Sequence, residues 1–211
     1  EPTELLAPVI DQVHKAGGVF IADEVQCGFA RSGEALWGYH RHGIDPDIAT
    51  MGKPMGNGYP VAGIAVRHDL VAQFGTDMRY FNTFGGNTVA IAAAQAVWNV
   101  IRDEKLQDNA YTVGKHLAAG LRELAERHEV IGDVRGSGMY YGVEIVADRV
   151  TQQTDPATTT AIVNGLRERR VLISATGEDG SVLKIRPPLV FSEADATRLV
   201  TELDAVLTSL R

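Results

Sequence analysis

The chain has 211 residues, a formal net charge of −7 and a single cysteine, Cys27. This length is enough for one large domain or two small ones, and an acidic balance without a dense Lys/Arg run argues against a nucleic-acid-binding protein. No apolar run approaches the roughly 20 residues that span a bilayer, so we expect no membrane partner. One cysteine allows no internal disulfide, which fits a cytoplasmic protein.

The first elements predict a helix followed by a buried strand. Residues 7–16 have the apolar spacing of an amphipathic helix, and the continuous apolar run 19–22 is typical of a strand buried on both faces of a parallel sheet. This strand ends at Asp23. Because ligands bind beyond the carboxyl ends of strands in open α/β sheets, Asp23 lies where a site is expected.

A lysine in a loop rich in Gly and Pro separates two further apolar runs. Residues 48–51 and 61–66 predict strands, and Lys53 lies between them with Gly52 and Pro54 as neighbours. Such a loop is bent and closely packed, so we expect Lys53 to lose contact with water. Desolvation favours the neutral amine, which is the nucleophile that Schiff-base chemistry with an aldehyde cofactor requires. The alternative for this stretch alone is a surface lysine on a turn.

Helices dominate the middle of the chain. We expect them at 69–74, 88–102 and 106–129, and an aromatic, Gly-rich stretch at 80–87 leads into the second. Thr83 and the Gly residues there offer a hydroxyl and free backbone N–H groups at a helix entrance. This pattern fits a phosphate contact, and an ordinary helix N-cap is the alternative.

Beyond residue 129 the pattern alternates between helix and strand. It predicts a small α/β domain, so that the chain divides into domains 1–103 and 104–211, with Ser192 and Asp195 capping the last helix. The chain opens at Glu1, without Met and just before a helix that leads into a buried strand, so we expect a piece of a longer protein. The elements expected in this part are a turn at 134–138, strands at 139–146, 171–174 and 182–186, and helices at 157–170 and 193–210.

Asp23 and Lys53 are separated by 30 positions, the interval of one strand, a connection and the next strand. Both can therefore face one crevice. A carboxylate in that crevice can hold a proton on a pyridine nitrogen and keep the ring cationic, which makes the ring an electron sink. The amine can then act as a general acid and base at the α-carbon of an amino acid.

Four motifs resemble the class III pyridoxal-phosphate aminotransferases, of the ornithine, 4-aminobutyrate and alanine–glyoxylate type. They occur in the family's order over nearly the whole chain, and the stretches MGKPMGNG (51–58) and YFNTFGG (80–86) are also similar to the phospholyase branch, which eliminates phosphate from phosphorylated amino compounds. Ala30 and Ser32 depart mildly from the family pattern. The motifs are IADEVQCGFARSG (21–33), MGK (51–53), NTFGGN (82–87) and LKIRPPL (183–189).

The resemblance implies an α/β fold and a set of site residues. The fold would be part of PLP-dependent transferase fold type I: a portion of the large, mostly parallel-sheet domain and a small C-terminal α/β domain. The reaction would move an amino group between an amino acid or amine and a 2-oxo acid or aldehyde through a Lys53 Schiff base, in a homodimer with a shared active site, with no metal. The roles implied are Asp23 at the pyridine nitrogen of pyridoxal 5'-phosphate, Val25 on the ring face, Gln26 near the phenolic oxygen, Thr83 at the cofactor phosphate of the neighbouring subunit, and Arg186 at the substrate carboxylate.

The largest departure from the family is what the chain lacks. Family members carry the phosphate-cradling loop and a ring-stacking aromatic a hundred or more residues before the Asp motif, and their chains are about twice as long. We therefore expect the chain alone to bind pyridoxal phosphate weakly or not at all.

Several alternatives remain open. Within the enzyme class, the rival to transamination is phosphate elimination from substrates such as O-phosphoethanolamine. A truncated, non-catalytic dimerisation module is also compatible with half of the cofactor site, and Arg186 has the alternative of a surface arginine on a strand. A nucleotide hydrolase is disfavoured, because Pro54 follows Lys53 where a phosphate-binding loop needs Ser or Thr. A dinucleotide-binding fold is disfavoured too, because the Gly136-x-Gly138 pattern precedes a strand rather than a helix.

Overall fold

The computed structural model describes residues 5–210, which form two compact units, residues 5–107 and 108–210. We expected a domain boundary at 103/104; the division between the two units falls at 107/108, inside helix α4 (Leu106–Arg127). Within the described residues, no helix is both long and apolar enough to cross a membrane. Each unit is described by itself.

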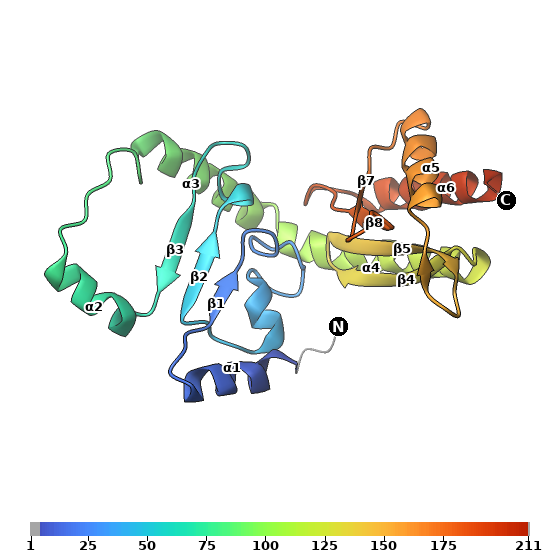
Figure 1. Ribbon diagram of the computed structural model, residues 1–211. Coiled ribbons are helices and arrows are strands. Elements are labelled where there is room, and N and C mark those ends of the chain that lie inside the picture. The colour runs from blue at the N-terminus through green and yellow to red at the C-terminus, as the bar shows by residue number, and fades with distance from the viewer. Residues whose placement is uncertain (1–4, 211) are drawn as a thin grey trace. The chain divides into compact units, whose positions relative to one another are not determined.

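The first unit contains a three-stranded sheet in the order β1-β2-β3 (Figure 1). Strands β1 and β2 are parallel, as the sequence predicted for this part of the chain, and β3 is antiparallel to β2. The elements are α1 (Leu6–Lys15), β1 (Ile21–Asp23), the 3-10 helix η1 (Gly38–His42), β2 (Ile48–Met51), the 3-10 helix η2 (Lys53–Gly56), β3 (Gly63–Val66), α2 (His68–Asp77) and α3 (Thr88–Asp103).

Asp47 ties three elements of this unit together. Its buried carboxylate accepts a hydrogen bond from the backbone N–H of Phe20 at 2.6 Å, lies 2.8 Å from His14 Nε2 on α1, and pairs with Arg67 after β3. Two hydrogen bonds lower the pKa of Asp47: the one from the Phe20 N–H has the larger effect, and the one with His14 has the next largest. The Asp47 side chain, just before β2, thus holds α1 against the start of β1.

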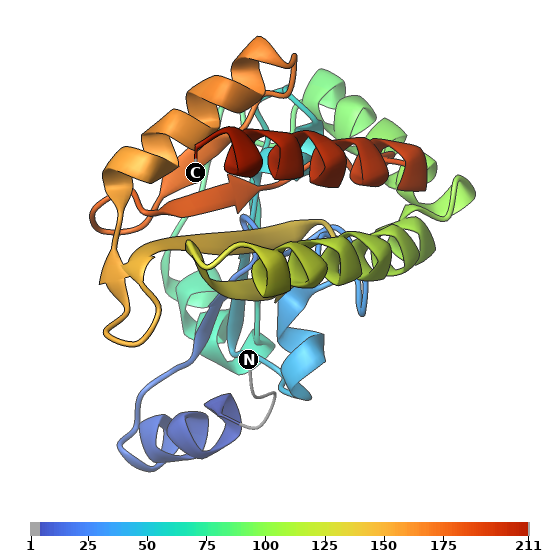
Figure 2. The same cartoon turned by 90° about the vertical axis from the view of Figure 1, so that its right-hand side faces the viewer.

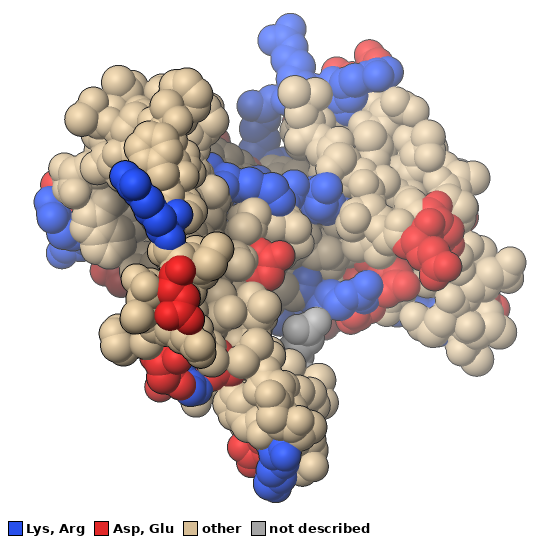
Figure 3. Space-filling model, turned by 60° about the vertical axis from the view of Figure 1, so that its left-hand side comes forward, with Lys and Arg blue, Asp and Glu red and all other residues tan. Residues whose placement is uncertain are grey.

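The expected burial of β1 on both faces is wrong for these residues. Ile21 is 52% exposed, although its neighbour Ala22 is buried. A strand of a parallel sheet is buried on both sides only where other elements cover both faces of the sheet. Among residues 5–107, the face of β1 that carries Ile21 is left uncovered. Figure 3 shows one face of the molecule, on which positive and negative side chains lie in separate places with uncharged stretches between them. Large apolar side chains are also exposed elsewhere in this unit, among them Ile64, Phe74, Met78, Tyr80, Phe81, Phe84 and Val89.

The second unit is an antiparallel sheet with helices on one face (Figure 2). Its strand order is β4-β5-β8-β7, and β6 pairs with the far end of β5. Leu183 and Ile185 of β8 point into a core that α4, α5 and α6 complete. The elements are α4, β4 (Ile131–Ser137), β5 (Tyr140–Asp148), β6 (Gln153–Thr154), α5 (Pro156–Glu168), β7 (Ser174–Thr176), β8 (Val182–Ile185) and α6 (Glu193–Ser209).

Two expectations for this unit are wrong. The stretch 134–138, expected as a turn, belongs mostly to strand β4, and the strand expected at 171–174 begins only at Ser174. Gly136 misled the sequence argument, because Gly usually interrupts a strand. Here it has φ +152°, and an added Cβ would lie 2.1 Å from the carbonyl oxygen of Tyr140, so pairing with β5 requires Gly at this position.

The predicted cap of the last helix is confirmed. Ser192 Oγ accepts a hydrogen bond from the backbone N–H of Asp195 at 3.2 Å, and Asp195 Oδ2 accepts one from the backbone N–H of Ser192 at 3.0 Å. This reciprocal capping box satisfies two helix-end donors of α6.

Candidate active site

Asp23 lies at the carboxyl end of β1, and one of its two carboxylate oxygens accepts hydrogen bonds. Asp23 is paired in register with Thr50 of β2, whose hydroxyl donates a hydrogen bond to Asp23 Oδ1 at 3.2 Å. The backbone N–H of Val25 donates to the same oxygen at 3.1 Å. Within residues 5–210 no hydrogen bond reaches Oδ2, and the side chain is exposed. The carboxylate is therefore held in place with one oxygen available as an acceptor.

Glu24, which the sequence analysis did not single out, anchors the segment after β1. It is only 2% exposed, and its carboxylate accepts hydrogen bonds from the backbone N–H groups of Gly38 at 2.7 Å and Tyr39 at 2.9 Å. Burial, followed by the charge of Glu24, raises the pKa of the Cys27 thiol to about 12. Cys27 therefore stays a protonated thiol at neutral pH. In the sequence, Glu24 is simply a second acid directly after Asp23. Only the folded chain shows that Asp23 is exposed at the strand end whereas Glu24 is buried and holds the backbone of Gly38 and Tyr39.

Lys53 opens the 3-10 helix η2 directly after β2. Its φ is +32°, a left-handed conformation that a residue with a Cβ adopts only when its surroundings impose it, and such strain is concentrated at functional sites. The expected loss of water from Lys53 is wrong for this chain, because the side chain is exposed. The loop is bent as expected, but the described residues do not cover it.

Val25 lies close to the turn that carries Lys53. An added Cβ on Gly52 would lie 4.0 Å from Val25 Cγ2, so the two stretches that follow β1 and β2 meet there. The structure thus brings Asp23, Val25 and the Lys53 turn to one edge of the sheet, where Thr50 of β2 is hydrogen-bonded to Asp23.

Gln26 and Thr83 are both exposed, and the structure places only Gln26 in this region. Thr83 belongs to the segment between α2 and α3, which lies on the β3 side of the sheet and away from β1 (Figure 1). Asn82 Oδ1 orders this segment by accepting hydrogen bonds from the backbone N–H groups of Phe84 at 3.1 Å and Gly85 at 2.8 Å. The helix N-cap weighed as the alternative role for this stretch falls to Asn87, whose side chain accepts from the N–H of Ala90.

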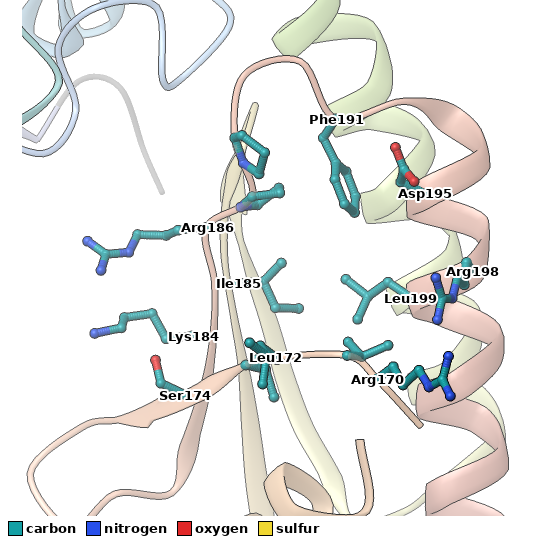
Figure 4. A pocket seen from close by; sticks show the side chains of 14 residues that line it. Arg170, Leu172, Ser174, Lys184, Ile185, Arg186, Phe191, Asp195, Arg198 and Leu199 are labelled. Carbon is teal, nitrogen blue, oxygen red and sulfur yellow. The ribbon is translucent and has the colours of Figure 1, made fainter. Parts of the chain in front are cut away.

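Arg186 lies in the second unit, just beyond β8. Its guanidinium carbon is 5.8 Å from the centre of the Tyr140 ring, within the range of a cation–π contact. Together with Lys184 it borders a cavity of about 500 Å³ (Figure 4). An exposed guanidinium at the rim of a cavity is suited to binding a carboxylate or a phosphate through two parallel hydrogen bonds.

The strand-end residues fit pyridoxal 5'-phosphate. An available Asp23 oxygen can accept the N–H of a pyridinium ring, Val25 offers an apolar side chain for a ring face, and Lys53 supplies the amine that an aldehyde requires. In residues 5–210, no group of three or more His, Cys, Asp and Glu side chains is arranged to bind a metal ion.

An acid and a lysine at neighbouring strand ends are typical of enzymes that hold an aldehyde cofactor, and comparison with known proteins identifies the family. The chain matches class III aminotransferases over residues 1–207. It is 46% identical over 205 residues to alanine–glyoxylate aminotransferase 2 homolog 2, mitochondrial, of Arabidopsis thaliana. These 205 residues are 97% of this chain and 43% of that protein. It is 42% identical over 210 residues to ethanolamine-phosphate phospho-lyase homolog 1 of Caenorhabditis elegans, and the match covers 98% of this chain and 45% of that protein.

Solved structures give the same result. A phospholyase from Arthrobacter in complex with phosphoethanolamine is 40% identical with a TM-score of 0.94, over 98% of this chain and 49% of that one. A Bacillus anthracis aminotransferase is 30% identical with a TM-score of 0.92, and the match covers 99% of this chain and 48% of that one. The chain belongs to the class III aminotransferase family, a PLP-dependent enzyme family, and its fold is a part of fold type I. It spans about half the length of the relatives that it matches.

Proposed function

We propose that the protein containing this chain is a PLP-dependent aminotransferase that moves an amino group between an amino acid or amine and a 2-oxo acid or aldehyde. The observation that carries the proposal is the Asp23 carboxylate, fixed by Thr50 and the Val25 N–H with one oxygen available, at the strand end next to the Lys53 turn. Bound pyridoxal phosphate would supply a ring that withdraws electrons from the α-carbon of the substrate.

The residues of the chain would then have separate tasks. Asp23 would hold the proton on the pyridine nitrogen, which keeps the ring cationic. Lys53 would bind the cofactor aldehyde and, when the substrate amine replaces it, move the proton at the α-carbon. Its exposure here requires that residues outside 5–210, or a second subunit, exclude water from the amine in the working enzyme.

The remaining predicted residues would orient the cofactor and the substrate. Val25 would pack on the ring, Gln26 would lie near the phenolic oxygen, and Arg186 would bind the substrate carboxylate. Thr83 would reach the cofactor phosphate of a second copy of the protein. Its place on the far side of the sheet, in a segment already ordered by Asn82, supports a homodimer with shared sites.

A second candidate is phosphate elimination from O-phosphoethanolamine-like substrates. The observation that favours it is the likeness to a phospholyase at 40% identity and a TM-score of 0.94. The third alternative, a non-catalytic dimerisation module, is disfavoured by the presence of Lys53, Asp23 and Arg186 in the matching motifs.

Assays of the whole enzyme that carries this sequence test the proposal. An aminotransferase consumes a 2-oxo acid acceptor in step with the amino donor. Release of inorganic phosphate from O-phosphoethanolamine without any acceptor would contradict it and favour elimination. Lys53→Ala should lower either activity by at least about 10³-fold, whereas Lys115→Ala, on the exposed side of α4, should not. If Lys53→Ala kept its turnover, the proposed role of Lys53 would be wrong.

A further inference from the structure

The segment of residues 187–191 joins Arg186 to helix α6. Pro187 and Pro188 have a fixed φ and no backbone N–H, so the chain cannot continue β8 beyond Arg186. The backbone N–H of Phe191 instead donates a hydrogen bond to the carbonyl of Pro188 at 3.0 Å, which closes a turn. The position of this turn sets the direction in which the chain leaves β8. It therefore also influences where the Arg186 side chain points.

A half-buried side chain of α4, Asn109, holds segment 187–191 in place. Asn109 Nδ2 donates hydrogen bonds to the carbonyl oxygens of Leu189 at 2.7 Å and Phe191 at 3.1 Å. An amide nitrogen has two N–H donors, and both are used here. The carbonyls of an irregular segment have no strand neighbour to pair with, so Asn109 supplies the donors that a sheet would otherwise provide. The segment is thus fixed to α4 through its backbone.

Helix α4 also holds the aromatic ring that Arg186 contacts. The guanidinium carbon of Arg186 lies 5.8 Å from the centre of the Tyr140 ring, and Tyr140 follows the turn at Gly138 that joins β4 to β5. An added Cβ on Gly114 of α4 would lie 2.3 Å from the carbonyl oxygen of Gly138, so helix and turn are in backbone contact there. Figure 4 shows Arg186 on the side of β8 opposite to Leu199, so packing in the core does not fix its direction. Both of its neighbours, the ring and the segment that follows it, are attached to α4.

We propose that Asn109 is a positioning residue: by fixing segment 187–191 to α4, it holds Arg186 over the Tyr140 ring in the orientation that binds substrate. An arginine binds an anionic group through two parallel hydrogen bonds, which requires its planar guanidinium to have one orientation. Fixing that orientation in the free enzyme lowers the entropy lost on binding. Asn109 itself does not touch the substrate. The inference rests on the proposed function, because it takes the role of Arg186 from there.

A double-mutant cycle in the whole enzyme tests whether Asn109 acts through Arg186. Asn109→Ala should raise the KM of the amino substrate about three- to tenfold and leave kcat within about twofold, because two neutral hydrogen bonds are lost away from Lys53. In the Arg186→Gln background the same change should alter KM by less than about twofold. Asn109→Gln, which keeps both N–H donors on a longer side chain, should restore part of the wild-type KM.

Hydrogen exchange gives a readout that needs no turnover. Asn109→Ala should speed the exchange of the amides of residues 189–191 at least about threefold in the whole enzyme, whereas the amides of β4 should keep their rates. Asn164→Ala on α5 is the matched control, because this exposed side chain makes no hydrogen bond to any residue of 5–210, so KM and exchange should both stay at wild-type values. If Asn109→Ala does not fold, Asn109→Ser, which keeps one shorter donor, takes its place in both measurements with smaller effects.

Three results would overturn the proposal: unchanged KM in Asn109→Ala, an equally large rise in KM in the Arg186→Gln background, or unchanged exchange of residues 189–191. Failure of the proposed function would look different. An enzyme that releases phosphate without a 2-oxo acid acceptor would contradict transamination, but the cycle is still read from the KM of that substrate. Exchange is read even from an enzyme without turnover.

Discussion

At the scale of single residues, Thr50 is a side chain whose importance depends on one hydrogen bond. Its hydroxyl donates to Asp23 Oδ1 and helps to fix the carboxylate while the second oxygen stays available. A donor of this kind positions the acid without touching the cofactor ring. Neither its position in the sequence nor its residue type distinguishes Thr50 from other strand threonines.

Thr50→Val tests this role, because valine keeps the shape and removes the donor. In the whole enzyme we expect the dissociation constant for pyridoxal phosphate to rise about three- to tenfold, measured by absorbance of the bound cofactor. Thr76→Val on α2, whose hydroxyl donates to the carbonyl of Ala72, should leave cofactor affinity unchanged. Equal affinity in wild type and Thr50→Val would show that Val25 alone holds the acid.

Two helical glycines should respond to alanine with opposite signs. An added Cβ on Gly114 of α4 would lie 2.3 Å from the carbonyl oxygen of Gly138, whereas one on Gly75 of α2 meets nothing within 4 Å. Gly114→Ala should therefore cost about 1–3 kcal/mol in the free energy of unfolding. Gly75→Ala should add about 0.5–1 kcal/mol, because alanine is the better helix former. Denaturant titration followed by circular dichroism measures both, and a stabilising Gly114→Ala would contradict the close contact.

At the scale of elements, the start of α6 depends on its capping box. Ser192→Ala removes the side-chain acceptor for the N–H of Asp195 and should lower the free energy of unfolding by about 1 kcal/mol. Thr201→Ala, in the middle of the same helix, should stay within about 0.5 kcal/mol. Urea titration of both variants measures the difference, and equal midpoints would show that the cap does not stabilise the helix.

The attachment of α1 to its sheet should depend on pH through Asp47. Because hydrogen bonds lower its pKa in the folded chain, its contribution is present above the ordinary value of about 3.9 and is lost as pH falls through the folded value. We expect the stability of the first unit to decrease between about pH 5 and pH 3. Both tryptophans, Trp37 and Trp98, lie in this unit, so their fluorescence reports its unfolding alone.

The matched variants for this pH dependence are Asp47→Asn and Asp11→Asn. Asp47→Asn should lower stability at pH 7 and flatten the dependence below pH 5, whereas Asp11→Asn, exposed on α1, should keep the wild-type profile. An unchanged profile in Asp47→Asn would assign the acid sensitivity to other carboxylates.

At the scale of the whole molecule, the two units should differ in stability. Every residue of the main apolar core cluster lies in the second unit, between Ala110 and Leu207. The first unit instead exposes large apolar side chains from Ile21 to Val89. Because burial of apolar surface is the main source of stability, the amides of β5 and β8 should exchange with solvent at least about tenfold more slowly than those of β1 and β2. Hydrogen exchange measured by mass spectrometry tests this, and uniform exchange across the chain would contradict it.

Much of the fold and of the site could be predicted from the sequence, because the signals are local. Apolar spacing predicted α1, α3 and α6 to within a few residues, and the Ser192–Asp195 pair predicted a cap. The interval between Asp23 and Lys53 predicted neighbouring strand ends, which the parallel register of β1 and β2 confirms. The motifs around these residues predicted the family, which the match over residues 1–207 confirms.

What the sequence by itself determined is therefore the order of the α-helices, the family, and which chemical groups lie at the ends of β1 and β2. Only the tertiary structure decided that Lys53 and Ile21 are exposed and that residues 131–137 pair with β5. The physical reason is that spacing and caps depend on neighbours along the chain, whereas burial and strand pairing depend on segments that the fold alone brings together.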